Sequence, residues 1–238
     1  MIIRTHSYTF TIGMHVLIIG GSGGTGHIAV QLAKLKGATV TAVCSLQNAA
    51  FVKALGADTV INYDKTDNLE QDFARAVERM GLFDMVFDTV SSADARDALY
   101  HYENNIRNSS YPLMVKGSEG KYVRLSGSPT DWLLAHMKRF LGFSFFQRNH
   151  GLFWVRFGNS SEELEELCCY VESENLMPVI SMHLPFTQLG VQKAFIYQLN
   201  RRTVGKMVID IIPDAPNDDE VGKFGTLKTG QDEEKCVI

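Results

Sequence analysis

The chain has 238 residues, of which 45% are hydrophobic and 21% charged, an ordinary balance for a folded protein of one or two domains. The net charge of −4 gives no electrostatic argument for nucleic acid or an anionic membrane as partner, and no apolar run approaches the ~18 residues of a membrane span. The four cysteines form no C-x-x-C pair and the seven histidines no H-E-x-x-H motif. This pattern gives no indication of a disulfide framework or of a zinc site, and it favours a reducing compartment.

The first residues, 1–13, precede the first predicted strand. Residues 1–12 contain one arginine, several hydroxyl side chains and no acid, which is weakly typical of a mitochondrial transit peptide. Because the segment is short and leads directly into the strand, we interpret it as a replaced or truncated start.

Residues 15–37 predict a strand, a glycine-rich turn and a helix in direct succession. The turn is Gly21-Ser22-Gly23-Gly24-Thr25-Gly26, and its glycines fit G-x-G-x-x-G between the apolar run 15–20 and a helical pattern over 26–37. This order is the context that a dinucleotide-binding fingerprint requires, with a pyrophosphate held at the helix start. The alternative is a turn without a ligand, which leaves three closely spaced glycines unexplained.

The remainder of the chain alternates between strand and helix patterns. Further strands are expected at 37–44, 59–62, 83–88, 121–126, 152–157 and 206–210, and helices at 47–55, 69–80, 93–102, 132–140, 160–175 and 189–199. Repeated β-α units with buried strands predict an α/β fold, a doubly wound parallel sheet of the Rossmann type with helices on both faces. Residues 213–238 are rich in Asp, Glu, Gly and Lys and are expected to be disordered.

The end of the second predicted strand indicates which cofactor is bound. In the NAD form of the motif an acid about 20 residues after the glycines binds the ribose 2′-hydroxyl. Here that place is occupied by Val43, Cys44 and Ser45, without an acid. An acid would repel a 2′-phosphate, whereas a serine hydroxyl can donate to one, so we expect NADPH. Residues 46–48 contain no arginine or lysine to pair with the phosphate.

Several stretches, in order and spacing, give the chain a family resemblance over about residues 14–212. They are GGSGGTGHIAVQLAKLKGATVTAVCS at 20–45, LGADTVINY at 55–63, FDMVFDTV at 83–90, MPV at 177–179, LPF at 184–186 and GKMVID at 205–210. On these motifs the sequence is similar to the zinc-independent quinone oxidoreductases of the medium-chain dehydrogenase/reductase superfamily. Within that family it most resembles the reticulon-interacting mitochondrial oxidoreductases.

The resemblance implies which residues surround an NADPH molecule. Ser22, Gly24 and Thr25 would contact the pyrophosphate. Ser45 and Tyr63 would meet the 2′-phosphate end, Tyr63 through either its phenol or its ring face.

At the other end of the cofactor, the resemblance places Thr89 and Leu125 beside the nicotinamide half. Arg202, Thr203 and Val204 would close over the cofactor, and Arg201 or Arg202 would supply the missing cation for the phosphate.

The family also has an amino-terminal GroES-like domain that forms the other wall of the substrate cleft. Its place is before residue 14, and we expect it to be absent. The expected organisation is a replaced start at 1–13, a Rossmann domain at 14–182, a carboxyl-terminal segment at 183–212 that normally packs on the absent domain, and a disordered tail at 213–238. Apolar residues of the third part would then lack packing, namely Phe186, Phe195, Ile196, Val208 and Ile209.

The activity that the resemblance implies is NADPH-dependent reduction of quinones or conjugated carbonyl compounds, impaired by loss of the first domain. The alternative is a non-catalytic NADP(H)-binding or interaction module. No catalytic residue is assigned. A short-chain dehydrogenase is excluded because its Y-x-x-x-K pair is lacking: Tyr111 and Lys116 lie one residue too far apart. We expect a small-molecule substrate, a homodimer or a partner covering the carboxyl-terminal segment, and a cytoplasmic location, with a mitochondrial one as the alternative.

Three smaller features complete the expectations. His27, in the first helical turn, is expected to be exposed, with contact to a phosphate as the alternative. Asp84 and Asp88 are expected to end hydrogen-bond networks rather than to form an acid–base pair. Cys168 and Cys169 are adjacent on a helix and are expected to face different directions, as core residue and neighbour.

Overall fold

The computed structural model describes residues 10–90, 102, 106, 108–115, 120–125, 133, 150–152, 161–200 and 203–211. These residues separate into two compact units. The first contains the described residues up to Val179 together with Val204–Lys206, and the second contains those from Ile180 to Thr203 and from Met207 onward. The functional boundaries expected at 14–182 and 183–212 remain a prediction.

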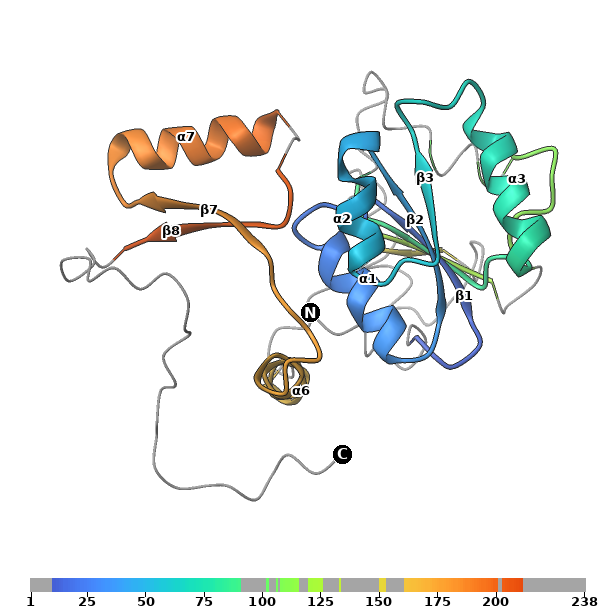
Figure 1. Ribbon diagram of the computed structural model, residues 1–238, viewed down its shortest axis with the longest axis horizontal. Helices are drawn as coiled ribbons and strands as arrows, with labels where there is room; N and C mark the ends of the chain where they lie inside the picture. The colour runs from blue at the N-terminus through green and yellow to red at the C-terminus, as the bar shows by residue number, and fades with distance from the viewer. Residues whose placement is uncertain are drawn as a thin grey trace. The chain divides into compact units, whose positions relative to one another are not determined.

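A six-stranded parallel sheet forms the centre of the first unit (Figure 1). Its strands are β1 (His15–Ile19), β2 (Thr39–Cys44), β3 (Thr59–Asn62), β4 (Met85–Asp88), β5 (Lys121–Arg124) and β6 (His150–Leu152). Their order, β3-β2-β1-β4-β5-β6, is that of the doubly wound dinucleotide-binding fold, in which the direction of winding reverses between β1 and β4. The predicted Rossmann-type sheet is therefore confirmed.

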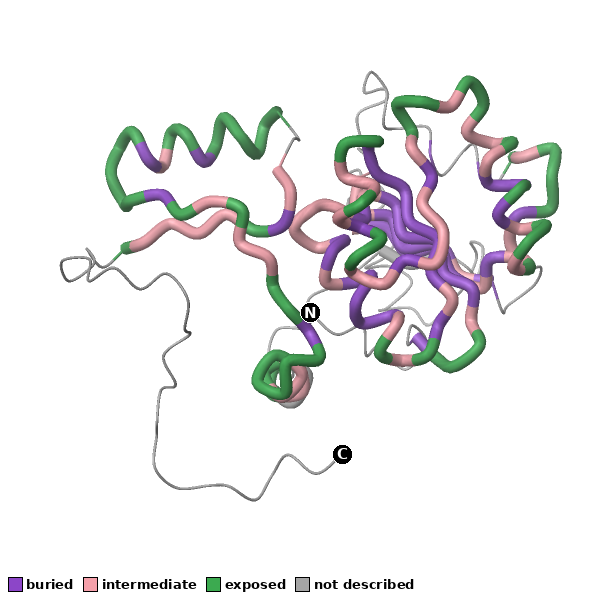
Figure 2. Tube along the Cα trace, in the orientation of Figure 1, coloured by how far each residue is buried: buried purple, intermediate pink, exposed green. Residues whose placement is uncertain are grey.

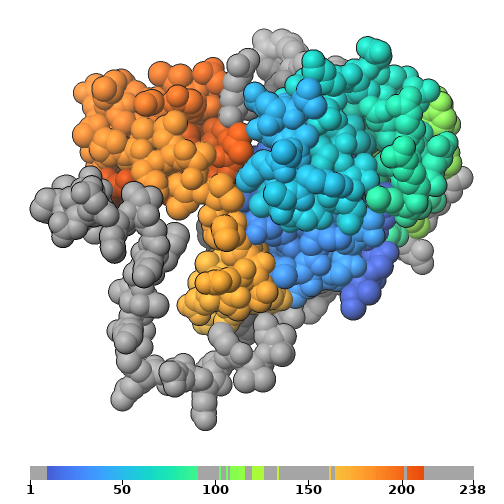
Figure 3. Space-filling model, viewed as in Figure 1, coloured from blue at the N-terminus to red at the C-terminus, as the bar shows by residue number. Residues whose placement is uncertain are grey.

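Helices cover both faces of this sheet. They are α1 (Gly26–Leu35), the short 3₁₀ helix η1 (Leu46–Asn48), α2 (Ala49–Ala54), α3 (Leu69–Met80) and α6 (Ser161–Glu172). Residues of α1, α2 and α6 pack with one set of strand side chains, and residues of α3 pack with the other set. In the space-filling view, the blue-to-teal residues from α1 to α3 form one continuous surface on the part of the first unit that faces the viewer (Figure 3).

Strand β1 shows why the chain folds this way. Val16 and Ile18 point into the core beneath α1, while Leu17 and Ile19 point into the core beneath α3, and all four are fully buried. A strand buried on both faces needs no polar residue in alternation, which explains the continuous apolar run of the sequence. Figure 2 shows the same burial along the neighbouring strands.

Some element boundaries differ from the expected ones. Strand β2 begins at Thr39 rather than at residue 37, because Gly37 takes a φ of +77° in the turn after α1. Strand β6 begins at His150, two residues earlier than expected. Residues 153–157 lie outside the described part of the chain, as do the tail and nearly all of the helices expected at 93–102 and 132–140.

The second unit consists of a helix and two paired strands: β7 (Ile180–Pro185), α7 (Gln188–Leu199) and β8 (Lys206–Asp210), whose first residue belongs to the first unit. The side chain of Thr187 caps α7 by accepting a hydrogen bond from the Gly190 amide at 3.1 Å. Several large apolar side chains of this unit are exposed, among them Phe186, Leu189, Phe195, Ile196 and Leu199, whereas Val208 and Ile209 are half-buried.

None of the described helices has the length and apolar character needed to cross a membrane.

Two aspartates around β4 hold neighbouring strands together. The Asp84 carboxylate accepts a hydrogen bond from the His15 amide at 2.8 Å. The Asp88 carboxylate accepts one from the Tyr122 hydroxyl at 2.6 Å and another from the Val90 amide at 3.0 Å. Both aspartates therefore end hydrogen-bond networks, as expected.

We predict that Tyr122→Phe lowers the free energy of unfolding by about 1–2 kcal/mol, because the buried Asp88 carboxylate loses the hydrogen bond from the Tyr122 hydroxyl. Urea denaturation measures the change. The same substitution at the exposed Tyr111 is the control and should change stability by less than about 0.5 kcal/mol. Equal effects at the two tyrosines would contradict the role given to the Asp88 bond.

Candidate functional site

The candidate site lies at the carboxyl ends of the parallel strands. The turn of residues 20–25 joins β1 to α1, Ser45 and Tyr63 follow β2 and β3, and Thr89 and Leu125 follow β4 and β5. Because all of these strands run in the same direction, the residues that follow them lie along one edge of the sheet. Ligands of open α/β sheets bind at this edge, where the winding reverses.

The glycine turn places the start of α1 directly against the end of β1. The Gly20 and Gly21 amides donate to the Val43 carbonyl at 3.0 and 2.9 Å, and the Gly23 amide donates to the Gly20 carbonyl at 3.0 Å. A Cβ atom on Gly26 would lie 2.0 Å from the Gly20 carbonyl oxygen. No side chain can be tolerated at residue 26 without moving the backbone.

Packing within the protein requires a glycine at residue 26 but not at residue 23. A Cβ atom on Gly23 would meet only the Gly20 carbonyl oxygen, at 3.4 Å, an ordinary contact distance. The reason for a glycine here is therefore not internal packing. Close approach of a ligand to the backbone is the reason that the fingerprint gives for its second glycine.

The turn also presents unused hydrogen-bond donors. Among the described residues, the backbone N–H groups of Ser22, Gly24, Thr25 and Gly26 donate no hydrogen bond within the protein. Four donors gathered at a helix N-terminus, where the helix dipole is positive, form a binding site for an anion such as a pyrophosphate.

At the end of β2, Ser45 is buried, whereas Tyr63 after β3 is 48% exposed. Sequence reasoning missed two neighbouring residues. The Asn48 side-chain amide donates to the Ser22 hydroxyl at 3.3 Å, and the Asp64 carboxylate accepts from the Leu46 amide at 2.8 Å. The Asp64 carboxylate therefore lies at the end of β2, although Asp64 follows β3 in the sequence. The dinucleotide-binding fingerprint does not predict an acid at that position.

The Cys44 thiol lies just below this end of the site. Burial raises its pKa to about 11, with a smaller contribution from the Asp64 carboxylate. The thiol therefore stays protonated at neutral pH and is not a reactive nucleophile.

The two residues expected beside the nicotinamide are fixed to the strand ends. The Thr89 hydroxyl donates to the Ile19 carbonyl at 2.7 Å, and the Leu125 amide donates to the Asp88 carbonyl at 3.1 Å. Thr89 therefore lies beside the switch point between β1 and β4, and Leu125 lies at the end of the next strand, β5.

The closing segment expected at 202–204 is only partly described. Arg201 and Arg202 lie outside the described residues, and Thr203 belongs to the second unit. Val204, Gly205 and Lys206 belong to the first unit, where the Gly205 amide donates to the Ser22 carbonyl at 2.9 Å. We call these three residues the strap.

Lys206 is a cation at the glycine turn that sequence reasoning missed. A Cβ atom on Gly24 would lie 3.9 Å from the Lys206 ammonium nitrogen. The only signal in the sequence was a lysine at the start of the last predicted strand, and alternation along a strand does not show which lysine meets the glycine turn.

The expectation that His27 is exposed was wrong. Its side chain is fully buried, Nδ1 lies 2.9 Å from the Gly23 carbonyl oxygen, and Nε2 accepts a hydrogen bond from the Val179 amide at 3.2 Å. Burial lowers the pKa of His27, and the nearby Lys206 ammonium also lowers it, against an opposing hydrogen bond to Gly23. Cys168 is exposed and Cys169 is half-buried, so the expectation of a core residue at this pair was also wrong.

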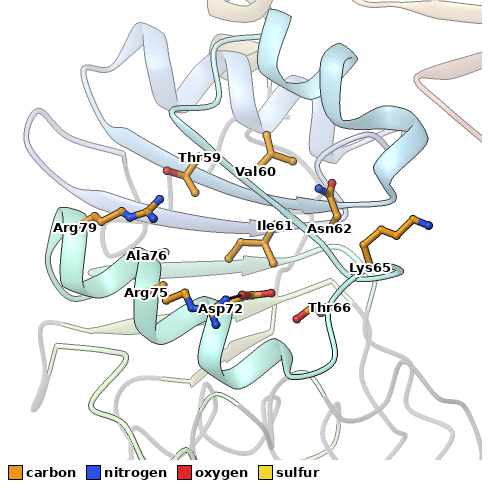
Figure 4. A pocket seen from close by; sticks show the side chains of 10 residues that line it. All are labelled: Thr59, Val60, Ile61, Asn62, Lys65, Thr66, Asp72, Arg75, Ala76 and Arg79. Atoms are coloured by element: carbon orange, nitrogen blue, oxygen red, sulfur yellow. Dashed lines mark hydrogen bonds and ion pairs between the residues drawn. The ribbon is translucent and has the colours of Figure 1, made fainter.

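A separate cavity of about 330 Å³ lies along the edge strand β3 (Figure 4). Side chains of α3 line it together with residues of β3 and of the loop between them, including Lys65, Asp72, Arg75 and Arg79. None of the residues expected to bind the cofactor lines this cavity. It is therefore not the candidate site.

Within the described residues, no group of three or more His, Cys, Asp or Glu side chains is arranged to hold a metal ion.

Comparison with known proteins places the chain in a family. Residues 55–209 match the family model described as zinc-binding dehydrogenase. The chain is similar to the solved structure of the quinone oxidoreductase from Coxiella burnetii, with 27% identity and a TM-score of 0.60, covering 85% of this chain and 54% of that one.

Three curated relatives match most of this chain. The chloroplastic NADPH-dependent alkenal/one oxidoreductase of Arabidopsis thaliana is 29% identical over 86% of this chain and 42% of its own length. The mitochondrial NAD(P)H oxidoreductase RTN4IP1 of Bos taurus is 32% identical over 84% and 48%. The trans-enoyl reductase pgmF of Aspergillus terreus is 44% identical over 84% and 52%. The chain thus spans about half the length of the curated relatives it matches.

The order of the strands, the glycine turn at the switch point and these similarities agree. The chain belongs to the zinc-binding dehydrogenase family, in the zinc-independent branch of the medium-chain dehydrogenase/reductase superfamily that contains the quinone oxidoreductases.

Proposed function

We propose that this chain is the cofactor-binding part of an NADPH-dependent oxidoreductase that reduces conjugated carbonyl compounds or quinones. The observation that carries the proposal is the row of unused N–H groups in the glycine turn, at the switch point of the sheet. The printed names of the relatives support the cofactor and the class of substrate. Because the chain spans about half of those proteins, the complete activity is part of the proposal.

In the proposed complex, the amides of Ser22, Gly24 and Thr25 bind the pyrophosphate, within the turn shaped by Gly21, Gly23 and Gly26. Lys206 adds a positive charge beside Gly24. The residues found here fit a dinucleotide, since unpaired backbone donors and a cation suit a pyrophosphate.

The two ends of the cofactor take the remaining residues. Ser45 and Tyr63 bind the 2′-phosphate end, Thr89 and Leu125 border the nicotinamide, and the segment from Arg202 to Val204 closes over it. When bound, reduced nicotinamide supplies the hydride. The chain's own contribution is binding and orientation, and we assign no general acid, so solvent supplies the proton.

A non-catalytic NADP(H)-binding module is the second candidate. It is favoured by the aspartates of the sheet, because Asp84 and Asp88 are occupied in structural hydrogen bonds and form no acid–base pair. For the cell compartment we propose the cytoplasm, on the lack of a disulfide framework. The mitochondrial location in the name of the bovine relative is the alternative.

We predict that NADPH binds saturably and more tightly than NADH, as measured by cofactor fluorescence and thermal stability. Ser45→Ala and Tyr63→Ala should each weaken NADPH binding about three- to tenfold and leave NADH binding unchanged, since each removes one hydrogen bond to the 2′-phosphate. NADPH oxidation in the presence of a quinone or an enone distinguishes the two candidates: the module binds NADPH without turnover. A folded chain that binds neither dinucleotide contradicts both.

Gly23 and Gly26 give a matched pair of variants. Gly23→Ala should leave the melting temperature nearly unchanged and weaken NADPH binding at least tenfold, because the methyl group meets the ligand and not the protein. Gly26→Ala should lower the melting temperature strongly, because its methyl group would collide with the Gly20 carbonyl. Thermal unfolding and NADPH titration measure both effects. Gly23→Ala with wild-type affinity would show that no ligand approaches this turn.

We also propose that the exposed apolar side chains of α7 are covered in the working protein by a second copy of the chain or by a partner. Exposed apolar patches of this kind mark interaction surfaces. For a homodimer, light scattering should give twice the chain mass, and Phe195→Gln should shift it toward the monomer. A monomeric wild-type chain would leave the partner as the covering molecule.

A further inference from the structure

Helix α1 holds a segment that is distant in the sequence. The Gln31 side-chain amide donates to the Met177 carbonyl at 3.0 Å, and the Met177 amide donates back to the Gln31 side-chain oxygen at 2.8 Å. One helical turn earlier, His27 Nε2 accepts from the Val179 amide. Both side chains are buried, so these bonds are shielded from water.

The same segment fixes the strap to the glycine turn. The Val179 carbonyl accepts a hydrogen bond from the Lys206 amide at 2.7 Å, and the preceding residue of the strap, Gly205, donates to the Ser22 carbonyl. His27 connects back to the turn at the Gly23 carbonyl. A closed circuit of hydrogen bonds therefore runs from the glycine turn through His27 and Val179 to the strap and back.

The partners of His27 fix its protonation. A backbone amide such as that of Val179 can only donate, so Nε2 must be unprotonated to accept its hydrogen bond. The Gly23 carbonyl can only accept, so Nδ1 must carry the hydrogen. The circuit thus requires the neutral ring with its proton on Nδ1.

We propose that His27 is a positioning residue for the dinucleotide site: its neutral ring joins the glycine turn to the strap and so holds Lys206 beside the bound phosphates. This inference rests on the proposed function, since it concerns the binding of the same cofactor. His27 itself does not touch the cofactor and acts through the backbone of Gly23 and Val179.

Protonation of His27 would break the circuit. A proton on Nε2 would place two donors against each other at Val179, and the charged ring would lie close to the Lys206 ammonium. Of the other described neighbours, Gln31 is neutral, and α2 presents the ring of Phe51, whose centroid lies 6.5 Å away.

The sign of the pH dependence follows from the pKa of His27, which lies below its ordinary value of 6.5 mainly because of burial. The neutral ring is complete above pH 6.5 and is lost as the pH falls through the lowered pKa. Cofactor affinity should therefore be full above pH 6.5 and should decrease toward acid pH.

Two substitutions separate the two bonds of the ring. In His27→Gln, the side-chain oxygen can still accept from Val179 but cannot titrate. In His27→Asn, the shorter amide can still donate to Gly23 but does not reach Val179.

His15→Gln is the control for general acid sensitivity, because His15 is also buried with a lowered pKa but bonds Gly81 and Thr41 instead. Lys53→Met is the control for loss of a lysine, because Lys53 bonds the Asp58 carbonyl at the opposite edge of the sheet.

The experiment is calorimetric titration with NADP⁺ between pH 5.5 and 8, with circular dichroism at each pH to verify the fold. At pH 7.5, His27→Asn and Lys206→Met should bind about five- to tenfold more weakly than wild type, while His27→Gln, His15→Gln and Lys53→Met should stay within about twofold. The 2′-phosphate titrates in the same range, so the decisive quantity is the ratio of wild-type to His27→Gln affinity, which should fall below pH 6.5. Hydrogen exchange at the Val179 amide should be faster in His27→Asn than in wild type.

The outcomes separate this proposal from the proposed function. A folded wild-type chain that binds no dinucleotide overturns both. Binding that His27→Asn does not weaken, or a ratio of wild-type to His27→Gln affinity that is independent of pH, overturns the role of His27 alone. If His27→Asn loses its fold, the pH-dependent ratio with His27→Gln still decides, since a purely structural histidine changes stability without changing that ratio.

Discussion

The contact between Gly26 and the Gly20 carbonyl is the constraint on which the rest of the site depends. Because α1 begins in contact with the end of β1, the chain turns through Ser22, Gly24 and Thr25 without an acceptor for their N–H groups among the residues that the structure describes. Such groups must be satisfied by water or by an anion. The fold therefore lacks some internal hydrogen bonds at this edge of the sheet. The burial of β1 on both faces stabilises the sheet and compensates for the missing bonds.

The same helix carries the second part of the arrangement. His27 and Gln31, one turn apart on α1, bind the backbone of residues 177–179, and that backbone holds the strap. Helix α1 thus contributes to the phosphate site in two ways, through the free donors at its N-terminus and through the side chains on its flank. A change in the tilt of this helix would alter both at once, so the two halves of the phosphate site are coupled through one rigid element.

The sequence was sufficient for the features that depend on local pattern. The strand at 59–62 and the helix at 69–80 match the expected bounds because period and end signals agree there, with Asn68 capping the helix. The burial of His27 and the approach of Lys206 to the glycine turn could not be predicted. His27 and Val179 lie 152 positions apart in the sequence, and a pattern of apolar residues does not specify which distant backbone amide a side chain will meet. The proposed roles of Ser45, Tyr63, Thr89, Leu125 and the segment from Arg202 to Val204 remain predictions.

The preference for NADPH in the proposed site rests on neutral hydroxyl donors. The hydroxyls of Ser45 and Tyr63 are neutral donors, and each of their hydrogen bonds contributes about 0.5–1.5 kcal/mol net. Asp64 stands at the same end of the sheet, where its carboxylate accepts a hydrogen bond from the Leu46 amide. Lys206 lies beside Gly24 and therefore serves the pyrophosphate, which NADPH and NADH share. Among the described residues, selection between the two cofactors then depends on two hydroxyl groups, whose combined effect should be about ten- to a hundredfold rather than an absolute barrier.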